Sequence, residues 1–275
     1  MTGETPQTQA LAAVVFDWAG TVVDFGSLAP MGAFVRLFER HGVPIDIDEA
    51  RAPMGLPKWH HILALGRQPR IKAAWRAVHG RDFDEHDADR LHEEFTPMSA
   101  EAVAGHAELI PGTLETLAWL RARGLRIGST TGYTRPIMAV LAPLAAAQGF
   151  VPDSLVCAGD LSENRPSPMG MYRSFLELGV WPAWRVVKVD DTVPGLLEGR
   201  HAGCWTVGIA ASGNACGLTL AQWQALDDEA REACSVQARR QLEVAEPDFI
   251  IDSVAELPSV IRTIDRWLAD GARPI

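Results

Sequence analysis

A short apolar run near the amino terminus reads Leu11-Ala12-Ala13-Val14-Val15-Phe16-Asp17, and the organisation of the chain follows from it. No polar residue interrupts it before Asp17, as expected of a central strand buried on both faces of a parallel sheet. Similar runs recur along the chain, at Leu125–Thr130, Ser154–Ala158, Val186–Asp190, Trp205–Ile209 and Phe249–Asp252. We therefore expect six strands in one sheet.

Amphipathic helical patterns separate most of these runs. They cover Gly112–Arg123, Thr134–Gln148, Pro168–Leu178, Thr192–Ala202 and Val254–Leu268. Strands that alternate with helices at this spacing predict an α/β fold, a doubly wound, Rossmann-like parallel sheet.

Residues 45–106 break the alternation, because helix-like segments follow one another there with no strand candidate. We expect them to form an inserted α-helical domain, and residues 1–44 and 107–275 to form the Rossmann-like core. A second helical stretch, Thr219–Val244, is rich in charge and is typical of a solvated surface helix. Its role stays open.

The composition excludes several classes of partner. Among the 275 residues, 47% are hydrophobic and the net charge is -10, with no basic tract that would attract nucleic acid or an anionic membrane. The segment Met1–Ala10 lacks the layout of a secretion signal, and no apolar run reaches membrane-spanning length. We therefore expect a cytoplasmic protein. The cysteines show no metal-binding spacing, so we expect all four to be reduced: Cys157, Cys204, Cys216 and Cys234.

Asp17 ends the first strand and opens a turn that contains Gly20 and Thr21. In open α/β sheets the ligand lies beyond the carboxyl ends of the strands. A carboxylate there can attack phosphorus, and the amides of a glycine turn can hold phosphoryl oxygens. Taken alone, an aspartate that caps a helix or forms a turn explains the pattern as well.

The other strand ends complete a chemically consistent set. The second strand ends in Thr130-Thr131, a lone cation, Arg165, follows the third, and the fourth ends in Asp190-Asp191. Carboxylates from two strand ends form a hard-ligand site suited to Mg²⁺, which would offset repulsion between an anionic nucleophile and a phosphoryl group. Together these parts predict a magnesium-dependent hydrolase with Asp17 as nucleophile.

This order of motifs resembles the haloacid dehalogenase superfamily, in which an inserted cap domain sets substrate specificity. Phosphatases of that superfamily carry a second aspartate two positions after the nucleophile, which protonates the leaving oxygen. Here that position is Ala19, whose side chain cannot act as an acid. The resemblance therefore implies a leaving group that is stabilised in another way.

Only three of the 25 basic residues are lysines, and a lysine can form an imine whereas an arginine cannot. Lys58 follows Pro57 at an expected helix start, where the partial positive charge of the helix disfavours protonation of the amine. His61 lies three residues on and could relay a proton. A solvated surface lysine is the alternative reading, and it is the expectation for Lys72. We expect Lys188 to point away from the site or to pair with a neighbouring acid.

Four segments are similar to the phosphonoacetaldehyde hydrolase family: Phe16–Thr21, Glu49–Gly55, Ile127–Tyr133 and Trp205–Gly208. This resemblance implies a Schiff base on Lys58, with Met54 and His61 beside it, and attack on phosphorus by Asp17. It further implies Mg²⁺ ligands at Asp17, the Ala19 carbonyl and Asp191, and a basic residue at Arg165. Some superfamily members add an aspartate four residues beyond the metal-binding one, where this chain has Gly195, so Asp190 stays open as a further ligand.

The implied reaction is hydrolysis of phosphonoacetaldehyde to acetaldehyde and phosphate. Thr131 and Arg165 are expected to hold the phosphoryl group, and His61 and Tyr133 to handle protons. A phosphate-ester phosphatase, a haloacid dehalogenase and a non-catalytic phosphonate-binding protein remain as alternatives. The resemblance also implies a homodimer formed through the cap, for which Trp59 and Trp75 are candidate contacts unless they belong to the cap core.

Overall fold

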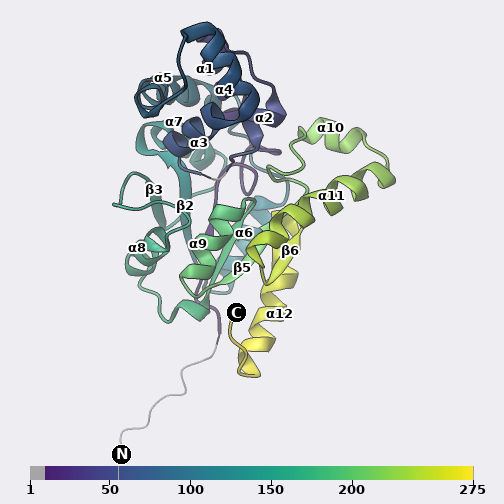
Figure 1. The fold of residues 1–275 in the computed structure, drawn as a ribbon. Helices are drawn as coiled ribbons and strands as arrows, with labels where there is room; N and C mark the ends of the chain where they lie inside the picture. Colours follow the sequence, from purple (N-terminus) through teal and green to yellow (C-terminus); the bar gives the residue numbers. More distant parts are fainter. Residues whose placement is uncertain (1–9, 55, 275) are drawn as a thin grey trace, which may run out of the picture.

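A computed structural model describes residues 10–54 and 56–274 of the chain. Residues 1–9 and Gly55 lie outside the described residues. The prediction that Met1–Ala10 lacks a secretion signal therefore falls mostly outside them. The sheet has six parallel strands in the order β3-β2-β1-β4-β5-β6. Figure 1 labels β2, β3, β5 and β6 among them. Their bounds are β1 Ala13–Phe16, β2 Arg126–Thr134, β3 Ser154–Ala158, β4 Val186–Asp190, β5 Trp205–Ile209 and β6 Phe249–Ile251. The predicted doubly wound α/β sheet is confirmed, strand by strand.

Helices cover both faces of this sheet, and the alternation of side chains along β1 divides them. Val14 and Phe16 share a core with residues of α6 (Thr113–Ala122), α7 (Arg135–Ala147) and α12 (Leu257–Ala269). Ala13 and Val15 point to the other face and pack with α8 (Met169–Leu178). The helix α9 (Val193–His201) follows β4 and packs against β4 and β5. Because β1 is apolar on both sides, it can lie at the centre of the sheet.

The regular elements of the insertion are all helices, which Figure 1 shows together at the top of the molecule. The insertion has a hydrophobic core of its own. Its helices are α2 Ile47–Arg51, α3 Lys58–Arg67, α4 Pro69–His79 and α5 Glu85–Ala104. The preceding helix α1 (Ala29–Arg40) contributes Phe34 and Phe38 to the same core. We therefore propose that the helical unit spans residues 29–104, a longer segment than the expected 45–106, and we call the remaining described residues the sheet domain.

The two tryptophans of the insertion differ in burial. Trp75 is fully buried and meets the ring of Phe83 edge-on, with 4.7 Å between the ring centroids. Trp59 is partly buried, and its indole Nε1 donates to Asp89 Oδ1 at 2.7 Å. Trp75 is thus a core residue of the helical unit.

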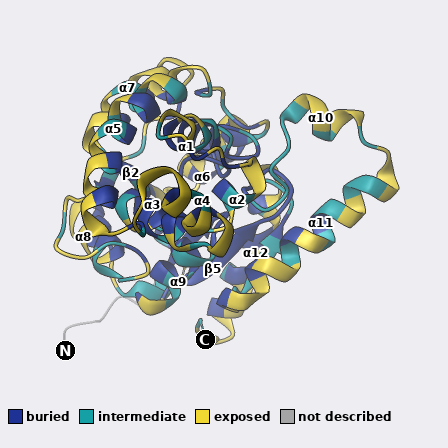
Figure 2. Ribbon diagram, turned by 45° about the horizontal axis from the view of Figure 1, so that its top comes forward, coloured by how far each residue is buried: buried dark blue, intermediate teal, exposed yellow. Residues whose placement is uncertain are grey.

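The charged stretch after β5 forms two helices, α10 (Leu220–Ala225) and α11 (Asp228–Leu242). Figure 2 shows both at the outside of the molecule, with exposed residues along much of their length. The expected surface helix is confirmed for α10, whereas α11 buries Ser235, Ala238 and Leu242 against the sheet domain. Within the described ranges, no helix combines the length and apolar character needed to cross a bilayer.

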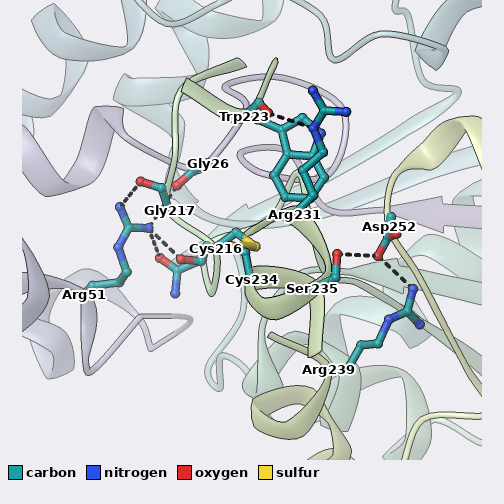
Figure 3. The surroundings of a disulfide bond; sticks show 11 residues. Gly26, Arg51, Cys216, Gly217, Trp223, Arg231, Cys234, Ser235, Arg239 and Asp252 are labelled. Carbon is teal, nitrogen blue, oxygen red and sulfur yellow. Dashed lines mark hydrogen bonds and ion pairs between the residues drawn. A yellow bond between two sulfur atoms is a disulfide. The ribbon is translucent and has the colours of Figure 1, made fainter. Parts of the chain in front are cut away.

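The expectation of four reduced cysteines is wrong for one pair. Cys216, in the loop after β5, and Cys234, on α11, form a disulfide that Figure 3 shows in its surroundings. The two cysteines are 18 residues apart in sequence, and the way α11 folds back onto the loop brings them together. Cys157 and Cys204 are free and buried.

The core of the helical unit can be tested through Trp75. We expect Trp75→Ala to lower the free energy of unfolding by about 3–5 kcal/mol, because it leaves a cavity between buried aromatic rings. Urea unfolding followed by circular dichroism measures the change. Leu176→Ala is the matched control, since Leu176 is 81% exposed and should change stability by less than about 0.5 kcal/mol. Equal losses in the two variants would contradict the placement of Trp75.

Candidate active site

The carboxyl ends of β1 and β4 bring three aspartates together. The two strands run side by side with Phe16 opposite Val189, and the backbone N–H of Asp17 donates to the Val189 carbonyl at 2.9 Å. Asp17, Asp190 and Asp191 therefore leave the sheet at the same edge. All three are buried, and each offers an oxygen within 4.8 Å of the other two. Such a buried acidic triad can hold a metal ion.

The turn after β1 needs a glycine for a steric reason. Gly20 has a φ of +83°, and a Cβ at this position would lie 2.1 Å from Asp191 Oδ2. Asp191 can thus approach the turn closely, where its Oδ2 accepts a hydrogen bond from the backbone N–H of Asn214 at 2.7 Å. The glycine in the first motif makes room for a carboxylate supplied by β4.

Two buried cations balance the acids at this edge. Arg165 Nη1 lies 2.8 Å from Asp17 Oδ1, and its Nε lies 3.0 Å from Glu198 Oε2. Lys188 is completely buried, with its Nζ 3.1 Å from Asp190 Oδ2 and 3.3 Å from the same Glu198 oxygen. The second expectation for Lys188, pairing with a neighbouring acid, is confirmed.

Glu198 on α9 was missed by the sequence reasoning. A lysine in an otherwise apolar strand needs a buried partner, and this requirement is the signal that could have pointed to an acid on the following helix. Thr130 completes the group, because its Oγ1 accepts from Lys188 Nζ at 2.6 Å and donates to Glu198 Oε2 at 2.7 Å. Thr130 is thus engaged inside the protein, while its neighbour Thr131 lines a cavity.

Burial shifts the acidity of the triad. Desolvation and then repulsion from Asp190 raise the pKa of Asp17 to about 6, although Arg165 opposes the shift. Burial and repulsion from Asp17 raise the pKa of Asp191 well above its ordinary value. Desolvation also acts on Asp190, but its ion pairs with Arg165 and Lys188 outweigh it and lower the pKa. Asp17 and Asp191 are the carboxylates whose pKa is raised, Asp17 despite its ion pair with Arg165, so a hard divalent cation between them fits this donor set.

Lys58 reaches the same place from the helical unit. It is the first residue of α3 after Pro57, it is only 6% exposed, and its Nζ lies 4.0 Å from the Met54 sulfur. The amine also lies 5.2 Å from the centre of the Tyr133 ring, and it forms no ion pair with a carboxylate of the described residues. Desolvation lowers the pKa of Lys58 to about 8, aided by Arg165 and opposed by Asp17.

One cavity between the helical unit and the sheet domain gathers most of the residues singled out in the sequence. Its lining includes Asp17, Ala19, Met54, Lys58, Thr131, Tyr133, Arg165 and Asp191. The amine and the candidate nucleophile thus face one space from two different domains. Asp190 and His61 are the two predicted site residues that do not line it.

His61 lies within the core of the helical unit. Its ring stacks on Phe34 with 3.9 Å between centroids, and its Nε2 donates to the Ala50 carbonyl at 2.8 Å. Nδ1 is buried and has no hydrogen-bond partner among the described residues. Burial and the nearby charge of Lys58 hold the pKa of His61 well below its ordinary value. The ring is therefore neutral, with one free acceptor nitrogen.

Comparison with known proteins adds a second line of argument. The sequence pattern of the haloacid dehalogenase-like hydrolases matches residues 11–203. The phosphonoacetaldehyde hydrolase of Paraburkholderia xenovorans is 50% identical over 262 residues, which cover 95% of this chain and 98% of that protein. This chain belongs to the phosphonoacetaldehyde hydrolase family. The family member of Vibrio vulnificus is 44% identical, with 96% of this chain and 98% of that protein covered.

Solved structures agree with membership of the phosphonoacetaldehyde hydrolase family. A phosphonoacetaldehyde hydrolase-like protein from Oleispira antarctica superposes with a TM-score of 0.96 at 40% identity and covers 100% of this chain and 99% of that one. A β-phosphoglucomutase from Clostridium difficile has a TM-score of 0.66 at 17% identity, with 94% and 99% coverage. The second likeness concerns the fold alone.

Gly195 has a steric explanation in the structure. A Cβ at this position would lie 2.0–2.2 Å from the carboxylate atoms of Asp190, so no side chain fits there, including the aspartate that some superfamily members carry. Asp190 in turn accepts from Thr192 Oγ1 at 2.7 Å. The carboxylate of Asp190 thus fills the place that a side chain at position 195 would need.

This close packing leads to a test on stability. We expect Gly195→Ala to lower the free energy of unfolding by about 1–3 kcal/mol, because the added methyl group must displace the buried Asp190 carboxylate. Thermal unfolding measures the loss. Gly105→Ala is the control, since its Cβ would meet only one atom, at an ordinary 3.7 Å. A Gly195→Ala protein as stable as the control would show that Asp190 is not held where the structure has it.

Proposed function

We propose that this chain hydrolyses the carbon-phosphorus bond of phosphonoacetaldehyde to give acetaldehyde and phosphate. The observation that carries the proposal is the shared cavity, in which a buried amine without a carboxylate partner faces a buried carboxylate. The names of the relatives, which are 44–50% identical, support the same substrate. In this proposal Lys58 of the helical unit reacts with the aldehyde, and Asp17 of the sheet domain reacts with the phosphorus.

Lys58 begins the reaction at the aldehyde. Its neutral amine attacks the carbonyl carbon, and loss of water leaves a protonated imine. The lowered pKa supports this role, because an amine with a pKa of about 8 is neutral far more often near neutral pH than an ordinary lysine. Tyr133 lies beside the amine and its hydroxyl has no partner among the described residues, so we assign it to the protons around the imine. We assign His61 to the same relay through its free Nδ1, by way of water.

Asp17 then attacks phosphorus. The pair of electrons of the carbon-phosphorus bond moves to the imine and forms an enamine, while the phosphoryl group passes to the Asp17 carboxylate. Arg165 and Thr131 hold the phosphoryl oxygens. Water next cleaves the aspartyl-phosphate and releases phosphate. The enamine takes up a proton, and a second water hydrolyses the imine, which frees acetaldehyde and restores the amine of Lys58.

We propose Mg²⁺ as the cation of the acidic triad, held by Asp17, Asp191 and the backbone carbonyl of Ala19. When bound, it offsets the repulsion between the Asp17 carboxylate and the phosphoryl group. Asp190 is engaged by Thr192 and by the two buried cations, so we assign it the role of holding Arg165 and Lys188 in place.

A phosphate-ester phosphatase explains these features less well. Ala19 offers no acid to protonate an alkoxide, and a phosphatase has no use for the buried amine of Lys58. Release of phosphate from sugar phosphates, with none from phosphonoacetaldehyde, would favour that function. Binding of the phosphonate without turnover would favour a non-catalytic protein.

We further propose a homodimer, whose mass in solution can be measured by light scattering. A cytoplasmic location also stays a proposal. The free cysteines Cys157 and Cys204 are compatible with it, whereas the Cys216–Cys234 disulfide weighs against it because disulfides are rare in reducing compartments.

The imine can be trapped. We expect borohydride reduction in the presence of phosphonoacetaldehyde to attach a two-carbon adduct to Lys58 and to stop turnover, because the imine becomes a stable amine. Peptide mass spectrometry locates the adduct. Lys58→Arg should lose both labelling and turnover, whereas Lys72→Arg is the control, since Lys72 is a surface residue paired with Asp82. An adduct on any other residue, or turnover by Lys58→Arg, would contradict the proposed imine on Lys58.

The pKa of Lys58 predicts how trapping depends on pH. Because only the neutral amine attacks, the initial rate of labelling should rise through a pKa of about 8 and level off above it. Rates measured at a fixed aldehyde concentration from about pH 6 to about pH 10 give the curve. A rate that keeps rising towards the ordinary lysine pKa of 10.5 would show that burial does not lower the pKa of Lys58.

A further inference from the structure

We infer that Arg51 is a positioning residue, which latches the helical unit onto the sheet domain and so keeps Lys58 opposite Asp17. Arg51 is the last residue of α2, and its side chain leaves the helical unit to enter two loops of the sheet domain. The inference rests on the proposed function for its effect on turnover. Its structural part stands on contacts alone.

The guanidinium of Arg51 binds oxygens on both loops (Figure 3). Nη1 donates to the Gly26 carbonyl at 2.9 Å, to the Asn214 carbonyl at 2.7 Å and to Asn214 Oδ1 at 2.9 Å. Nη2 lies 3.4 Å from the carbonyl of Gly217. Hydrogen bonds from a charged donor are stronger than neutral ones, and the planar fork of arginine suits several acceptors at once.

In the described part of the chain, one other side-chain hydrogen bond joins the helical unit to the sheet domain, and it lies at the chain connection, where the Ala29 N–H donates to Asp24 Oδ2 at 2.9 Å. Every side-chain hydrogen bond between the described residues of 45–104 and the sheet domain comes from Arg51. The ion pairs of the insertion all stay inside the helical unit, for example Arg70 with Glu49 and Arg81 with Asp87. Loss of Arg51 would therefore leave the closure to apolar contact and the chain connections.

The sheet domain leaves space beside Gly217 for the Arg51 guanidinium, and we call this space the seat of Arg51. Gly217 has a φ of +63°, and a Cβ there would lie 2.5 Å from Cζ of Arg51, so only glycine leaves room for the side chain. The preceding residue, Cys216, is tied to Cys234 on α11, and the Gly26 N–H donates to the Ser212 carbonyl at 2.8 Å. The receiving loops are thus held to each other and to α11.

The latch connects both halves of the site. Asn214, which accepts from Arg51, donates its backbone N–H to Asp191 Oδ2 at 2.7 Å. On the other side, Arg51 is followed after three residues by Met54, whose sulfur contacts Lys58. An inter-domain cleft runs beside Arg51 and is also lined by Met54 and Asp191, so side-chain packing does not seal this border. Polar contacts must therefore hold the cavity closed here.

Kinetics test the latch. With phosphonoacetaldehyde as substrate, we expect Arg51→Ala to lower kcat roughly tenfold or more, because the closed arrangement becomes a minor population. Arg51→Lys should recover part of kcat, since an ammonium still reaches one or two of the carbonyls. Arg70→Ala is the matched control: it removes an arginine that bonds to the same helix, α2, but only within the helical unit, and it should stay within about twofold of the parent chain.

A second readout separates positioning from mere destabilisation. Borohydride trapping of acetaldehyde on Lys58 needs no phosphoryl transfer to Asp17. At about pH 10 even an exposed lysine is partly neutral, so Arg51→Ala should keep trapping there within about fivefold, whereas kcat near neutral pH falls roughly tenfold or more. Equal kcat for Arg51→Ala and Arg70→Ala would overturn the inference. A parallel fall of trapping and kcat would overturn it as well, because the defect would then lie in the helical unit.

An inter-domain distance tests the latch without turnover. Spin labels on cysteines at Val78 of α4 and Leu176 of α8 report on the two domains, since these residues are 53% and 81% exposed and the native free cysteines are buried. We expect a narrow distance distribution in the labelled parent and a broad or shifted one after Arg51→Ala. Unchanged distributions would refute the latch. A parent chain that does not turn over phosphonoacetaldehyde would refute the proposed function instead, and the distances would still decide on Arg51.

Discussion

The structure depends on a balance of buried charge at the carboxyl ends of β1 and β4. Four carboxylates meet there: Asp190 in β4, Asp191 directly after it, Asp17 after β1 and Glu198 on α9. Among the described residues, Arg165 and Lys188 are the cations that form ion pairs with this group. Buried acids are tolerated only when they are paired, neutralised or bound to a metal. Arg165 and Lys188 both pair with Asp190 and Glu198, and Arg165 also pairs with Asp17, so four carboxylates share two cations. Asp17 and Asp191 are the two of these carboxylates that line the cavity. The excess of negative charge thus lies where the proposed chemistry needs a cation.

The sheet was predictable because its strands are buried on both faces. Such strands are mostly apolar, so the pattern can be recognised within each segment without knowing which strands it pairs with. The chemistry at the strand ends was predictable for a related reason, since parallel strands bring their carboxyl ends to one edge. Asp17, Arg165 and Asp191 were found in this way and do line one cavity.

What escaped prediction depends on contacts between distant segments. The helical pattern of α1 does not say which domain its apolar face joins, and Phe34 joins the helical unit. The same contact explains His61: the three-residue spacing placed it on the face of Lys58, but the ring stacks on Phe34 and does not line the cavity. The Cys216–Cys234 disulfide, the partner Glu198 and the seat of Arg51 likewise join segments that no local pattern relates.

The division of the site between two hydrophobic cores has a chemical consequence. The sheet domain supplies a carboxylate and cations for phosphoryl transfer, yet Ala19 leaves it without an acid for the leaving group. The helical unit supplies the amine that can stabilise a carbon leaving group, and it holds that amine in an apolar setting against Met54 and Phe34, which lowers the pKa of Lys58. In the proposed mechanism, cleavage of a carbon-phosphorus bond needs groups from both domains. The choice of bond therefore depends on how firmly the two domains are held together, and the described residues concentrate that polar contact in Arg51.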